Sequence, residues 1–65
     1  MNQHQVEPLV HSPERAAQRL GVSLRAVYTL IAAGELKTFK RGKRRHIPDT
    51  ECSQYVARQM AEAAK

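Results

Sequence analysis

The chain has 65 residues, of which 11 are lysine or arginine and 6 are aspartate or glutamate, so its formal net charge is +5. A chain of this length can bury only one small core, which excludes a second domain and a deep substrate cleft. The excess of positive charge favours an anionic partner or surface. Cys52 is the only cysteine, which excludes an intramolecular disulfide and fits a reducing compartment.

The first residues give no sign of a targeting or membrane segment. They lack the basic start and apolar core of a signal peptide, and the apolar runs of the chain are too short to span a bilayer. We therefore expect a cytoplasmic protein without a membrane partner. Residues 1–7 are polar and are predicted to form a flexible lead-in to a single domain over residues 8–65. Within that domain, residues 9–11 are predicted to be a short strand or an extended segment.

A first helix is predicted over residues 13–20. Ser12 is a good N-cap, Pro13 suits the first helical position, and Glu14 meets the positive end of the helix dipole. Gly21 can adopt the left-handed conformation that ends a helix. Three apolar residues at helical spacing form the expected buried face: Ala16, Ala17 and Leu20.

A second helix is predicted over residues 24–33, with Ser23 as its N-cap and Gly34 after its end. Its expected inward face is apolar: Leu24, Val27, Leu30 and Ile31. The opposite face mixes small, polar and cationic side chains: Arg25, Ala26, Tyr28, Thr29 and Ala32. Such a mixture suits a surface that approaches a partner closely.

A basic β-hairpin is predicted over residues 36–47, because Arg41-Gly42 separates two short runs in the manner of a tight turn. Its expected anchors in the core are Leu36, Phe39 and Ile47. Six cations lie in or beside it: Lys37, Lys40, Arg41, Lys43, Arg44 and Arg45. Between residues 15 and 46 nine lysines or arginines accompany a single acid, Glu35. Charge of one sign at this density favours contact with phosphates.

A third helix is predicted over residues 49–63, with Asp49 and Glu51 in its first turn. The expected inward stripe contains Cys52, Tyr55, Val56 and Met60, with Gln59 as a further candidate. Arg58 and Glu62, four residues apart, are expected to pair on the outer face.

Two capped helices joined by a short turn are typical of a helix-turn-helix, in which the second helix enters the major groove of DNA. An ordinary antiparallel helix pair would have the same pattern, so the basic hairpin decides the interpretation in favour of DNA. The histidines have no metal-ligand spacing with one another or with Cys52. We therefore expect no metal, no cofactor, no catalytic residue and no small-molecule substrate, and hence no enzyme.

Three segments together resemble a known family: Ser12-Pro13-x-x-Ala16-Ala17-x-x-Leu20-Gly21-Val22-Ser23, then Val27-Tyr28-x-Leu30-Ile31-x-x-Gly34-x-Leu36, then Gly42-x-x-x-x-Ile47-Pro48. The pattern is similar to the excisionase-type winged helix-turn-helix of the MerR-like group. The resemblance implies a small α+β fold with three helices and a hairpin wing. It also implies a recognition helix in the major groove of double-stranded DNA, with the wing on an adjacent minor groove or its phosphates.

The resemblance also assigns residues. Five positions match the groove-facing part of the recognition helix: Ser23, Arg25, Ala26, Tyr28 and Thr29. Lys43, Arg44 and Arg45 match the wing. Lys40 and Arg41 are expected to contact DNA with them because they belong to the same basic hairpin. His46 stands where the family often has an arginine, and Arg45 where it frequently has an aromatic residue. These two departures favour an electrostatic role for the wing.

The resemblance implies a phage-type excisionase, also called a recombination directionality factor, acting in the cytoplasm of the host cell. Such a protein binds cooperatively near attachment sites, bends DNA and directs an integrase towards excision, with neighbouring copies of itself as partners. A small MerR-like transcriptional regulator would use the same face on DNA. A module that binds RNA or another protein is a third hypothesis, which predicts weaker binding to duplex DNA than to those partners.

Overall fold

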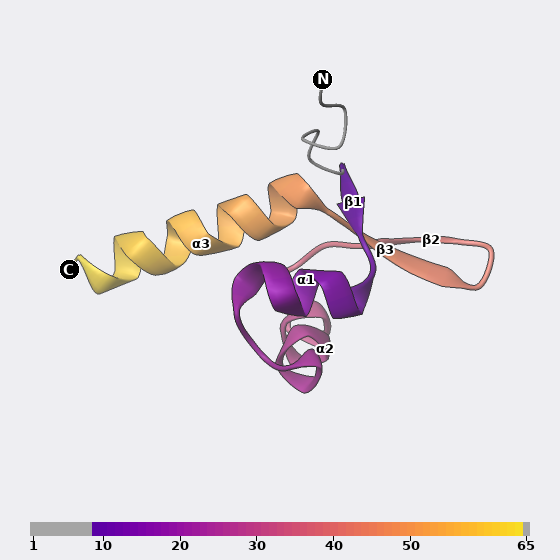
Figure 1. Ribbon diagram of the computed structural model, residues 1–65. Helices are drawn as coiled ribbons and strands as arrows, with labels where there is room; N and C mark the ends of the chain where they lie inside the picture. Colours follow the sequence, from indigo (N-terminus) through magenta and orange to yellow (C-terminus); the bar gives the residue numbers. More distant parts are fainter. Residues whose placement is uncertain (1–8, 65) are drawn as a thin grey trace, which may run out of the picture.

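The computed structural model describes residues 9–64 (Figure 1). Its elements follow in the order β1 (Val10–His11), α1 (Pro13–Leu20), α2 (Leu24–Ala32), β2 (Phe39–Arg41), β3 (Arg44–Pro48) and α3 (Asp49–Ala63). The predicted α+β winged helix-turn-helix is confirmed. The expected flexible lead-in, residues 1–7, lies outside the described residues. Within residues 9–64, no helix has the length and apolar character that crossing a membrane requires.

Side-chain caps set the starts of the two N-terminal helices. The hydroxyl oxygen of Ser12 accepts a hydrogen bond from the Arg15 amide at 3.1 Å, and that of Ser23 accepts one from the Ala26 amide at 3.1 Å. Gly21 ends α1 with a φ of 72°, a conformation that costs glycine little. The helices are therefore joined by a short turn. α2 ends at Ala32, one residue before the predicted end.

The three strands form an antiparallel sheet in the order β1-β3-β2. β1 confirms the expected short strand and pairs His11 with Ile47. The hairpin strands begin at Phe39, later than predicted, because residues 36–38 run from the helix pair to the sheet and bury Leu36. Gly42, at a φ of 64°, is the first residue of the two-residue turn, which is where a type II′ hairpin turn requires glycine. We call the hairpin over residues 39–48 the wing.

The core lies where α1, α2, β3 and the start of α3 meet. Its buried residues are Ala16, Ala17, Val27, Leu36, Ile47 and Cys52. Four partly buried residues pack against it: Leu20, Leu30, Ile31 and Tyr55. Burial also raises the pKa of the Cys52 thiol, which therefore stays protonated as a small apolar core residue.

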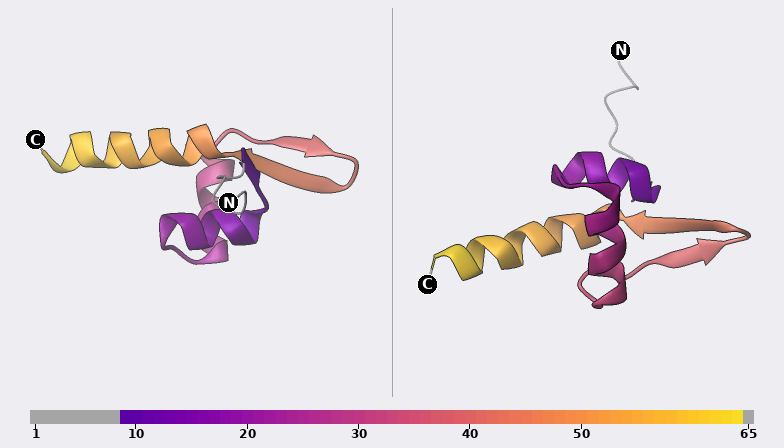
Figure 2. Two further views of the ribbon diagram at one scale, coloured as in Figure 1. Left: turned by 45° about the horizontal axis from the view of Figure 1, so that its top comes forward. Right: turned by 90° about the horizontal axis from the view of Figure 1, so that it is seen from below.

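Four residues that were expected to face inward do not, and Gln59, the further candidate in α3, is exposed as well. Phe39 is 44% exposed and stacks on His46, with 5.3 Å between the ring centroids, so it is not a core anchor. Leu24 at 37%, Val56 at 45% and Met60 at 69% are also exposed. The reason for the last two is visible in Figures 1 and 2: α3 extends away from the helix pair on the side opposite the wing, so only its first turns reach the core.

Asp49 ties three elements together. His11 Nε2 donates to Asp49 Oδ1 at 2.6 Å, and Arg19 Nε donates to the same oxygen at 3.0 Å. The Asp49 amide donates to the carbonyl of Leu9 at 2.8 Å. The hydrogen bonds from His11 and, secondly, from Arg19 hold the pKa of the Asp49 carboxyl below its ordinary value. β1, α1 and the start of α3 therefore meet at one carboxylate.

A second contact holds α3 to the end of the helix pair. Arg58 donates from Nη2 to the carbonyl oxygen of Glu35 at 2.6 Å. The same nitrogen lies 3.4 Å from Glu35 Oε1. Glu51 Oε1 accepts from the Lys37 amide at 2.9 Å. Side chains of α3 thus fix the segment that leads from α2 into the wing.

Replacing Asp49 with asparagine should lower the free energy of unfolding at pH 7 by about 1–2 kcal/mol, because it removes the charge that His11 and Arg19 contact. A lowered pKa in the folded state stabilises the fold above the unfolded pKa of about 3.9 and loses this effect as the pH falls through the folded value. Urea unfolding between pH 2 and 7 should therefore show a flatter acid limb for Asp49→Asn. Glu14→Gln, which removes an exposed carboxylate of α1, is the control. An acid limb as steep as that of the wild type would contradict the role of Asp49.

Candidate nucleic-acid interface

α2 packs on the core through Val27, which is fully buried, and presents its other side to solvent. Ser23, Arg25, Tyr28 and Thr29 are exposed, and Ala26 is partly buried. The Thr29 hydroxyl donates to the carbonyl of Arg25 at 3.1 Å and is engaged within the helix. The structure therefore places all five predicted recognition-helix residues on or beside the exposed side of α2.

These five residues divide between two hollows that α2 helps to line. Four of them, Ser23, Arg25, Ala26 and Thr29, line a shallow hollow of about 380 Å³ that Tyr55 of α3 lines as well. Tyr28, which is 46% exposed, lines a different groove. The spacing within α2 did not indicate that Tyr28 would be separated from Arg25, because the division depends on what packs on each side of the helix.

The second groove, which we call the wing groove, lies between the wing, the start of α1 and Tyr28, with a volume of about 670 Å³. Five cations line it: Arg15, Lys40, Lys43, Arg44 and Arg45. Arg15 was not among the predicted contact residues, although its place in the first turn of α1 and its charge were visible in the sequence. Glu14 lines the groove as well. The structure thus brings one cation of α1 and four of the wing to the same concave surface.

The wing places cations directly opposite one another, which destabilises the hairpin. In the β2–β3 ladder Lys40 lies opposite Arg45, and Arg41 lies opposite Arg44. Like charges directly opposite each other on a sheet are destabilising. Of these four cations Lys40, Arg41 and Arg44 are exposed, and Arg45 is partly buried. A polyanion placed along the wing would relieve this repulsion.

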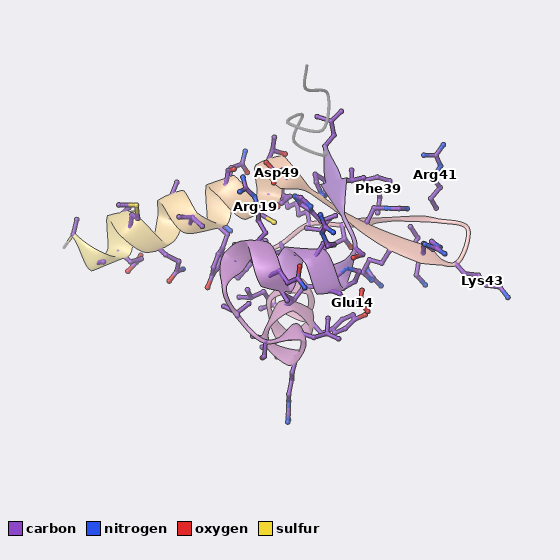
Figure 3. All side chains as sticks on the ribbon, in the orientation of Figure 1. Glu14, Arg19, Phe39, Arg41, Lys43 and Asp49 are labelled. Atoms are coloured by element: carbon purple, nitrogen blue, oxygen red, sulfur yellow. The ribbon has the colours of Figure 1, made fainter. Side chains whose placement is uncertain are left out.

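The wing groove takes in most of the predicted wing cations. Lys40, Lys43, Arg44 and Arg45 line the wing groove. In Figure 3 the side chains of Arg41 and Phe39 lie above the wing, whereas Glu14 lies below it and Lys43 extends from its tip. Arg41, the cross-strand partner of Arg44, is therefore the predicted wing contact that does not line the groove.

The sequence did not predict one polar contact, which joins the wing to the residue before it. Arg45 Nη1 donates to the hydroxyl oxygen of Thr38 at 2.6 Å. Thr38 precedes β2 and has no charge, so no motif marked it. Among residues 9–64, no group of three or more histidine, cysteine, aspartate or glutamate side chains is placed to hold a metal ion.

Two capped helices with a tight turn, beside a hairpin that carries opposed cations, define a small winged helix-turn-helix protein. Residues 12–60 match the family model described as a helix-turn-helix domain, and the chain belongs to this family. The match covers both N-terminal helices, the wing and most of α3.

The chain is also similar to a protein from Saccharopolyspora erythraea that is described as a probable excisionase, with 39% identity over 49 residues. The aligned part is 75% of this chain and 50% of that relative, so the chain spans about half the length of the relative. No solved structure matches the chain significantly. The predicted excisionase-type helix-turn-helix is confirmed by the family and the relative. Fold, family and cationic groove together support DNA as the partner.

Proposed function

We propose that this protein binds double-stranded DNA as an excisionase, with α2 in the major groove and the wing on the neighbouring minor groove or its phosphates. One observation carries the proposal: the exposed face of α2 adjoins a groove lined by five cations, in a chain that is 39% identical over 49 residues to a probable excisionase. The protein has no catalysis of its own in this proposal, and its contribution is the shape that it gives to DNA.

In this proposal α2 supplies the choice of DNA site. Arg25 is exposed near the start of α2, and an arginine there can donate two hydrogen bonds to O6 and N7 of a guanine. Ser23, Ala26 and Thr29 lie around the same hollow and allow close approach of the base edges. Tyr28, in the wing groove, contacts a phosphate on the flank of the site.

The wing supplies affinity. Its cations oppose one another across the β2–β3 ladder, so phosphates that approach them remove repulsion as well as adding attraction. Neutralising phosphates on one side of a duplex also favours bending towards that side. A cationic wing beside a recognition helix therefore suits a protein that bends its DNA.

A domain of this size touches few base pairs, so a single copy binds weakly. Cooperative binding of neighbouring copies near an attachment site compensates for this, and the bent array directs an integrase towards excision. The distal part of α3 offers the surface for a neighbour or for the integrase, because Val56 and Met60 are exposed there.

Replacing both Arg44 and Arg45 with alanine should weaken binding to all duplexes. Each lost phosphate contact lowers the slope of log K against log salt by about 0.9, so the double variant should lose about 1.8 of slope. Fluorescence anisotropy with a labelled duplex at several salt concentrations measures this. Lys37→Ala, which removes a cation outside the wing groove and keeps the backbone amide that Glu51 contacts, is the charge control. Binding and slope equal to those of the wild type would show that the wing does not contact DNA.

Arg25→Ala should reduce discrimination between DNA sites. Loss of a bidentate contact to guanine costs about 1–3 kcal/mol at the matched base pair and little on unrelated DNA. Sites selected from a random duplex library by the wild type provide the substrate, and competition binding provides the measurement. Gln54→Ala, an exposed change on α3, is the control. An equal loss on selected and unrelated duplexes would assign Arg25 to the DNA backbone.

The excisionase proposal itself predicts that the protein stimulates excision by a cognate integrase in a purified recombination assay. The Arg44→Ala/Arg45→Ala variant should stimulate less at equal concentration, because it occupies the DNA less. Site-specific DNA binding without any stimulation of excision would exclude the excisionase role and favour a small transcriptional regulator that uses the same face.

A further inference from the structure

Thr38, just before the wing, makes a side-chain hydrogen bond to one of the wing cations, Arg45. Arg45 Nη1 donates to Thr38 Oγ1 at 2.6 Å, and both residues are partly buried. The other cations that line the wing groove from the wing, Lys40, Lys43 and Arg44, are exposed. Arg45 is thus the wing cation whose side chain the fold holds in a defined place.

The Arg45 side chain also faces a like charge across the ladder. Lys40 lies directly opposite it in the ladder and repels its guanidinium. The hydroxyl of Thr38 holds one nitrogen of that group and leaves most of its five N–H donors available. A guanidinium that is already held in place loses less conformational entropy when it binds a phosphate than a free side chain does.

We propose that Thr38 positions Arg45 as a preorganised phosphate contact in the wing groove. The ligand is a phosphodiester of the DNA backbone, Arg45 contacts it directly, and Thr38 acts only through Arg45. This inference rests on the proposed DNA binding and adds a residue that neither the family pattern nor the charge of the wing indicates. The exposed cations at the wing tip contribute charge, whereas the Thr38–Arg45 pair contributes a fixed contact.

A double-mutant cycle with Thr38→Val and Arg45→Ala tests the proposal. Valine keeps the β-branched shape of threonine and its preference for extended structure, and it removes the hydroxyl. Thr38→Ser returns a hydroxyl and is the rescue variant. The probe is a fluorescent duplex of random sequence, because a phosphate contact does not depend on a particular site. Affinity is measured at several salt concentrations, and urea unfolding of each variant measures stability.

Thr38→Val should weaken binding by about 2- to 12-fold, which corresponds to the entropy of immobilising one long side chain. Its salt slope should equal that of the wild type, because Arg45 still neutralises its phosphate. Arg45→Ala should lower the slope by about 0.9. Thr38→Ser should bind like the wild type, and Thr38→Val should have no further effect when Arg45 is already alanine.

A Thr38→Val variant that binds like the wild type would overturn the proposal. An equal loss in the presence and absence of Arg45 would also overturn it, because Thr38 would then act by supporting the hairpin alone. Should Thr38→Val fail to fold, Thr38→Ala takes its place in the cycle. A wild-type chain that binds no duplex would remove the proposed function together with this inference, whereas binding that Thr38→Val leaves unchanged removes this inference alone.

Discussion

The Asp49 carboxylate is the contact on which the placement of the other elements depends. It accepts hydrogen bonds from His11 of β1 and Arg19 of α1 while it begins α3. Because β3 ends at Pro48, the same contact fixes the base of the wing against the helix pair. The angle between recognition helix and wing, which decides how both can reach one duplex, is therefore held by charge as well as by the small core.

Electrostatic repulsion within the wing lies at the surface where we propose that DNA binds. Opposed pairs of lysine and arginine in the β2–β3 ladder weaken the free protein. The same pairs strengthen a complex with a polyanion, since bound phosphates remove the repulsion. The two parts therefore suit different roles: α2 is suited to choosing a site, and the cationic wing to holding its phosphates.

Much of this arrangement could be predicted from local signals. Caps and turns depend on the backbone within a few residues, so each can be predicted without knowledge of the rest of the fold. This holds for the N-caps Ser12 and Ser23, the helix end at Gly21 and the hairpin turn at Gly42. The periodicity of α3 was less informative. Helical spacing shows that Val56 and Met60 share a face with Cys52, and it does not show how far along the helix a partner surface continues.

The order of residues alone specified the elements, the family and the sign of the charge, because caps, turns and a basic run act over a few neighbouring positions. Only the tertiary structure decided which cations share the wing groove with Arg15 and Tyr28, and that Arg41 does not line it. It also decided that Phe39 stacks on His46 outside the core and that Thr38 restrains Arg45. These features depend on strand register and on the packing of segments that are distant in the sequence. Neither can be predicted from local patterns in a single sequence.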